Sequence, residues 1–116
     1  MSPSLLDFLK HIEHECQFIL RISKDKARDE IIDDELLSKA IVRGLEIIGE
    51  AVKHLDDDFR LQYTHIEWKK IAGTRDMMIH HYFGIDHEVV WDIITDKIPS
   101  LLDHIQQIIA EQEAKQ

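Results

Sequence analysis

Residues 75–82 hold the densest group of chemically active side chains in the chain, in the order Arg-Asp-Met-Met-Ile-His-His-Tyr. If the chain is helical from residue 68 to residue 82, residues at three- and four-residue steps form one apolar stripe, which Arg75 interrupts. The stripe consists of Trp68, Ile71, Ala72, Arg75, Met78, Ile79 and Tyr82. A cation there needs an anion, an open cleft or another surface, since an unpaired buried charge costs on the order of several kcal/mol. Asp76 lies one helical turn before His80, so its carboxylate can orient the imidazole. The stretch is therefore a candidate site for phosphate binding and proton transfer.

The same residues also have a purely structural interpretation. Histidines near the C-terminal end of a helix interact favourably with the helix dipole, and an arginine in a helix is ordinarily a solvated charge. The chain has 8 histidines, but they are scattered and form neither an HExxH motif nor a Cys-rich pair, so we expect no metal site and no cofactor. Spacing alone leaves the catalytic and the structural interpretation open.

Length and composition favour a single helical domain over residues 1–116. Only 4 glycines and 2 prolines occur among the 116 residues, which disfavours a sheet with many tight turns. The single cysteine, Cys16, has core spacing with Ile12 and Ile19, so we expect a buried thiol in a reducing cytoplasm rather than a nucleophile. Neither a signal peptide nor a membrane-spanning run is recognisable, so we expect a cytoplasmic protein without membrane contact.

The net charge of −9 argues against nucleic-acid binding by the whole surface, because phosphate neutralisation needs clustered Lys and Arg. We therefore expect no DNA binding, and any RNA site must be local. The acidic runs at 33–35 and 56–58 are typical of helix starts and solvated loops. Residues 69–81 are the one region poor in acids.

Periodic apolar residues predict an all-α, up-and-down bundle of four to five helices. The first helix is expected to start after a Ser2 cap and to end near residue 22, and residues 25–32 should form a polar connection. A second helix, capped by Asp33 or Asp34, should run to about residue 55 and carry two apolar seams. It therefore has surface for more than one neighbour, and another subunit could be one of them. The seams are Ile41, Leu45, Ile48, Val52 and Leu55, and beside them Ala40, Gly44, Ile47 and Ala51.

The second half of the chain has further start and stop signals. Residues 64–67 have capping-box spacing, which predicts a third helix from about Ile66 to Gly84. Asp86 can cap a fourth helix, and Pro99 either kinks that helix or opens a fifth.

Arg75, His80 and Tyr82 together spell Arg-x4-His-x-Tyr, and the chain resembles the HepT-type toxins of the HEPN superfamily. The segment Leu-Glu-Ile-Ile-Gly-Glu-Ala at 45–51 resembles the second-helix signature of that family. Trp-Lys-Lys-Ile-Ala-Gly at 68–73 resembles the family's approach to its motif, and residues 82–91 resemble the segment on the C-terminal side of that motif. The likeness covers about residues 4–112.

This resemblance implies a metal-independent ribonuclease toxin that acts on RNA without a cofactor. It also implies a homodimer whose two motifs face one cleft, and a minimal nucleotidyltransferase as the cognate antitoxin. The site residues it indicates are the catalytic Arg75, Asp76 and His80 and the AMP-modified Tyr82. His81 and Glu50 are further, auxiliary candidates, and the family motif gives no role to His81.

A dimer also suits the geometry of the motif, because five residues of an ideal helix rotate by about 140° and turn Arg75 and His80 in different directions. Two alternatives stay open. The chain could be a non-catalytic helical partner or substrate-binding subunit of a nucleotidyltransferase, with both residues merely structural. Tyr82 could be an amphipathic residue that finishes the core stripe.

Overall fold

Every regular element in the described part of the chain is a helix, which confirms the all-α prediction. The computed structural model describes residues 3–80 and 87–116, and at positions 75, 77–80 and 87 it describes the backbone alone. The elements are α1 (Leu5–Ser23), α2 (Arg28–Ile32), α3 (Glu35–Lys53), α4 (Asp57–Gln62), α5 (Trp68–His80), α6 (His87–Asp92), the π-helical turn η2 (Ile93–Lys97) and α7 (Ile98–Ala114).

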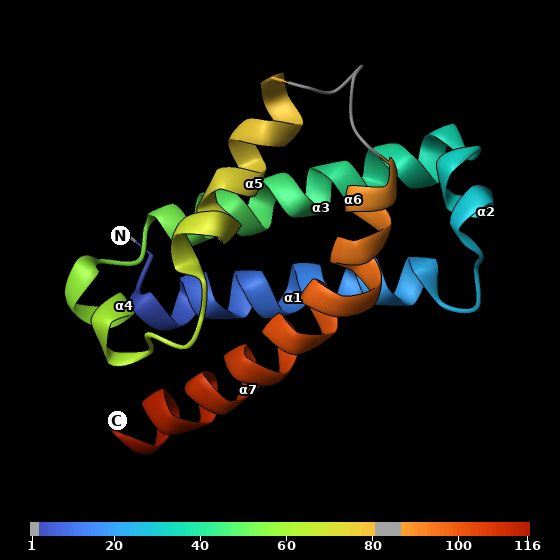
Figure 1. The fold of residues 1–116 in the computed structure, drawn as a ribbon. Coiled ribbons are helices and arrows are strands. Elements are labelled where there is room, and N and C mark those ends of the chain that lie inside the picture. The colour runs from blue at the N-terminus through green and yellow to red at the C-terminus, as the bar shows by residue number, and fades with distance from the viewer. Residues whose placement is uncertain (1–2, 81–86) are drawn as a thin grey trace.

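Three long helices, α1, α3 and α7, form the body of the molecule (Figure 1). Helices α1 and α3 lie side by side, α7 crosses α1 obliquely, and α5 packs on α3 and projects from the body (Figure 1). No helix in residues 3–80 and 87–116 is both long and apolar enough to cross a membrane. The most deeply buried side chains come from all three long helices, and they are Leu9, Ile12, Cys16, Ile19, Ile41, Val52 and Ile105.

One apolar seam of α3 is buried within the chain, and the other is buried in part. The five residues of the first seam are all buried, as predicted. In the second seam, Gly44 and Ala51 are buried too, and Gly44 lies against the Ile19 side chain of α1. The small residue Gly44 therefore lets α1 approach α3 closely, and α3 packs mainly against α1 and α5, with the short helix α2 as a further neighbour.

The start of α1 differs from the prediction. Ser4, and not Ser2, caps the helix, because Ser4 and Asp7 form a reciprocal capping box: Asp7 N–H donates to Ser4 Oγ at 3.2 Å and Ser4 N–H to Asp7 Oδ2 at 2.9 Å. Ser2 lies outside the described residues. The predicted polar connection over residues 25–32 is wrong in part, because Arg28–Ile32 forms α2, in which Ile31 is buried.

Asp34 caps α3, which confirms one of the two predicted caps. The helix ends at Lys53, two residues before the predicted end. The acidic run after it starts the short helix α4, which the apolar periodicity did not predict. Asp56 caps this helix by accepting a hydrogen bond from Phe59 N–H at 2.8 Å.

Helix α5 begins at Trp68, so the predicted start at Ile66 with a capping box from Thr64 is wrong. The reason is a local turn before the helix: Trp68 Nε1 donates to the carbonyl oxygen of Tyr63, five residues earlier, at 3.0 Å, and Ile66 is buried. The predicted stop at Gly84 and the predicted cap at Asp86 lie outside the described residues.

Pro99 lies in the first turn of α7, which continues from the π-helical turn η2 without a break in the helix. Proline has no N–H to donate to the residue four positions earlier, and at this point Ile98 N–H bonds to Ile93 O, five residues back. The wider turn thus carries the helix past the proline.

Cys16 is fully buried, and its burial raises the pKa of the thiol to about 12, so it stays protonated and packs as an apolar residue, as predicted.

Candidate functional site

One helix, α5, carries all three predicted catalytic residues. Its backbone is helical through Arg75, Asp76 and His80, so Asp76 and His80 are one turn apart as predicted. The beginning of the predicted apolar stripe is confirmed, because Trp68 and Ala72 are buried. The directions of the Arg75 and His80 side chains remain predictions, and His81 and Tyr82 lie outside the described residues.

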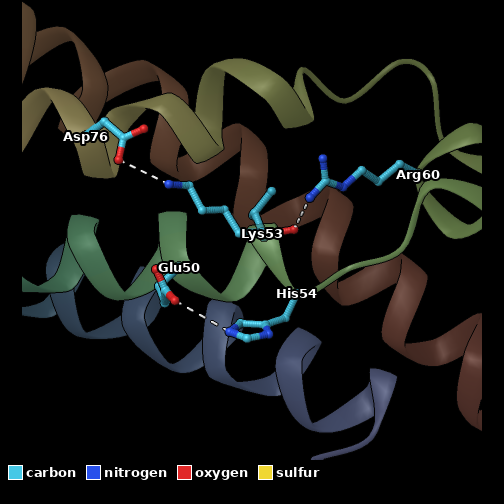
Figure 2. Close-up of polar contacts among 6 residues, drawn as sticks. Glu50, Lys53, His54, Arg60 and Asp76 are labelled. Atoms are coloured by element: carbon cyan, nitrogen blue, oxygen red, sulfur yellow. Dashed lines mark hydrogen bonds and ion pairs between the residues drawn. The ribbon is translucent and has the colours of Figure 1, made fainter.

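The side chain of Asp76 reaches back to α3. Its Oδ1 accepts a hydrogen bond from Lys53 Nζ at 3.1 Å, which joins residues 23 positions apart (Figure 2). Both side chains are partly exposed, 37% for Lys53 and 53% for Asp76. A charge-assisted hydrogen bond thus joins the residue after Arg75 to the last residue of α3. Lys53 could not be predicted as part of the site, since no local spacing connects it to the motif.

The C-terminal end of α3 is held from a second side as well. Arg60 of α4 donates from Nη2 to the carbonyl oxygen of Val52 at 2.6 Å (Figure 2). A cation is favourable there, because the last carbonyls of a helix lack helical donors and carry a partial negative charge. Helices α4 and α5 therefore both fasten the turn of α3 that presents Lys53.

Glu50, the auxiliary candidate on α3, lies on a different flank of that helix. Its Oε1 is 3.5 Å from His54 Nε2, and both side chains point toward α1 while Lys53 points toward α5 (Figure 2). The ring of Phe8 stacks on His54 with centroids 4.8 Å apart and planes 3° from parallel. These residues line a groove of about 250 Å³ between α1 and α3. The contacts of Glu50 with His54 and of Asp76 with Lys53 thus lie on different flanks of α3.

A larger groove of about 480 Å³ runs beside α5, between α3, α5, η2 and α7. Its lining combines apolar side chains such as Ile71 and Ile93 with cations and acids of both signs. Lys70 and Glu67 at its edge pair at 2.7 Å, and this hydrogen bond holds the pKa of the Glu67 carboxyl below its usual value. Helix α5 is thus flanked by an open groove rather than enclosed by protein.

The fold and this site define a small all-helical protein whose chemically active residues gather on one projecting helix. The model of the family described as Ribonuclease HepT-like matches residues 12–108. The chain therefore belongs to the HepT-like ribonuclease family, and the resemblance inferred from the sequence is confirmed.

Several relatives are similar over nearly their whole length. A putative RNase of Caldanaerobacter subterraneus subsp. tengcongensis is 40% identical over 106 residues, which cover 91% of this chain and 95% of the relative. A putative RNase of Methanocaldococcus jannaschii is 42% identical, covering 93% and 89%. A probable ribonuclease HepT of Thermococcus cleftensis is 33% identical, covering 93% and 98%. No solved structure matches the chain significantly.

Proposed function

We propose that this protein is a metal-independent endoribonuclease that acts as the toxin of a toxin–antitoxin pair in the cytoplasm. The observation that carries the proposal is the placement of Arg75 and His80 on one helix, α5, in a chain of the HepT-like ribonuclease family. The names of the relatives as RNases support RNA as the substrate.

The chemistry of the two side chains suits RNA cleavage. Attack of a ribose 2′-oxygen on the phosphorus requires removal of the 2′ proton and protonation of the departing 5′-oxygen. A histidine with a pKa of about 6.5 can do either, which is the role proposed for His80. Arg75 would hold the phosphate through its planar guanidinium group, and Asp76 would orient one of these two residues.

A homodimer would complete the site, because a single chain offers one arginine and one histidine that leave the helix in different directions. Two copies around one scissile phosphate would supply a base, an acid and two phosphate ligands. His81 and Glu50 are the auxiliary candidates, and Glu50 lines the groove between α1 and α3.

The cognate antitoxin in this proposal is a minimal nucleotidyltransferase that attaches AMP to Tyr82. The alternative from another class is a non-catalytic helical partner of a nucleotidyltransferase. It would bind the enzyme and cleave no RNA.

Cleavage of RNA by the purified protein in the presence of a metal chelator tests the proposal. Wild type should cleave, and His80→Ala and Arg75→Ala should each lose about 10² to 10⁴ in rate, the usual cost of removing an acid–base group or a transition-state ligand. His14→Ala, on the exposed surface of α1, is the matched histidine control. Cleavage only with added divalent metal, or full activity of His80→Ala, would contradict the assignment. An inactive wild type that still binds the nucleotidyltransferase would favour the partner function.

A further inference from the structure

The pair formed by Lys53 and Asp76 lies at the junction of α3 with the candidate site. We propose that Lys53 is a positioning residue: it holds the Asp76 carboxylate toward α3 and neutralises its charge beside Arg75, so that an RNA phosphate can approach. This inference rests on the proposed ribonuclease function and adds a residue from outside the motif to it.

The geometry supports a directed contact. Lys53 Nζ lies 3.1 Å from Asp76 Oδ1, within hydrogen-bond distance, and the turn of α3 that bears Lys53 is fastened by Arg60 at the carbonyl of Val52. Helices α3 and α5 pack extensively, and Trp68 and Ala72 anchor α5 in the core. The backbone at Lys53 is therefore held in place while its side chain reaches Asp76.

Stability alone does not explain the pair. Both side chains are partly exposed, and exposed ion pairs of this kind add little to the stability of a protein. The buried residues of α5 already hold the helix on α3. What the pair changes is the charge at the residue next to Arg75.

An acid beside a phosphate-binding arginine has an electrostatic cost. With Lys53 present, the three residues Lys53, Arg75 and Asp76 carry a net charge of +1 (two cations and one anion), and without it they carry zero. The whole chain has a net charge of −9, so local positive charge is scarce. Without the lysine, the carboxylate would repel RNA more strongly and compete for the guanidinium group.

Lys39 provides a matched control on the same helix. It pairs with Glu35, one turn earlier on α3, at 2.8 Å, and its side chain is 57% exposed. Lys39→Met removes the same charge from the protein as Lys53→Met but leaves the contact with α5 intact.

The test measures KM and kcat for a short RNA at low ionic strength. The variants are Lys53→Met, Lys53→Arg, Lys39→Met, Asp76→Asn and the double variant Lys53→Met/Asp76→Asn.

Lys53→Met should raise KM roughly fivefold, as expected for about 1 kcal/mol of electrostatic interaction, with a smaller change in kcat. Added salt should shrink the effect. Lys53→Arg should restore KM, and Lys53→Met should raise KM little further in the Asp76→Asn background, since no carboxylate is left to neutralise.

A carboxyl NMR titration of Asp76 supplies a readout that needs no RNA cleavage. Loss of Lys53 should raise the pH at which Asp76 titrates, and Lys39→Met should not. An unchanged titration, or a KM for Lys53→Met equal to that of Lys39→Met, would overturn the inference even if wild type cleaves RNA. Failure of wild type to cleave RNA would overturn the proposed function instead, whatever the titration shows. Thermal unfolding of each variant identifies a folding defect. If Lys53→Met is unfolded, the comparison of Lys53→Arg with wild type tests the inference instead.

Discussion

Gly44 of α3 lies directly against Ile19 of α1: a Cβ atom at Gly44 would be 3.0 Å from both Cγ1 and Cδ1 of that side chain. This close approach brings α1 onto one flank of α3, while the other flank supports α5 and presents Lys53. The candidate site thus depends on a helix contact on the opposite side of α3.

Gly73 and Gly44 should respond in opposite ways to alanine. Gly73→Ala adds a methyl group where nothing lies within 4 Å, so it should stabilise the protein by up to about 1 kcal/mol through helix propensity. Gly44→Ala has the same propensity gain, but overpacking against Ile19 costs about 1 to 3 kcal/mol, so the variant should be no more stable than wild type, and Gly44→Val clearly less stable. Urea unfolding measures the free energy of unfolding of all three variants. A stabilised Gly44→Val would show that the contact is loose.

Tyr63→Phe should destabilise the protein by about 1 kcal/mol near pH 8, because the Tyr63 hydroxyl donates to Glu111 Oε2 of α7 at 2.7 Å. Burial, and then this hydrogen bond, raise the pKa of Tyr63 above its ordinary value of 10.0. A raised pKa favours the protonated phenol in the folded state, so its contribution is complete below pH 10 and is lost as the pH rises through the folded pKa. The difference between wild type and variant should therefore shrink above pH 10. A difference that stays constant to higher pH would contradict this assignment.

The composite cleft predicts that two inactive variants complement each other. Light scattering should give twice the chain mass at micromolar concentration. Arg75→Ala and His80→Ala chains, unfolded and refolded together, should form mixed dimers with one intact Arg75 and one intact His80, and these should cleave RNA faster than either variant alone. A monomer with full activity would remove the basis for a shared cleft.

Tyr82 should carry AMP after co-expression with a cognate nucleotidyltransferase. The added phosphate would compete with RNA for Arg75 and the nucleotide would block entry, so cleavage should be lost without unfolding. Intact mass and peptide analysis locate the modification. Tyr63→Phe is the matched control, since the chain has 2 tyrosines, and its product should still be modified. Adenylylation confined to another residue, or neutralisation that persists in an active Tyr82→Phe variant, would leave Tyr82 a packing residue.

Local sequence patterns were sufficient to predict many features of this protein. The apolar seam of α3 and the buried Cys16 were both predictable from residue type and helical spacing. These features depend on neighbours within one or two turns, which a linear pattern records. The Arg-x4-His-x-Tyr motif belongs to the same class, and so the family could be inferred before the fold was known.

Tertiary contacts decided the rest. Gly44 of the second seam of α3 lies against Ile19 of α1 in the same chain. Lys53 meets Asp76 across 23 residues, a distance at which no helical period operates. Such contacts arise only when separate helices pack, because their partners are chosen by the crossing of two surfaces and not by spacing along one.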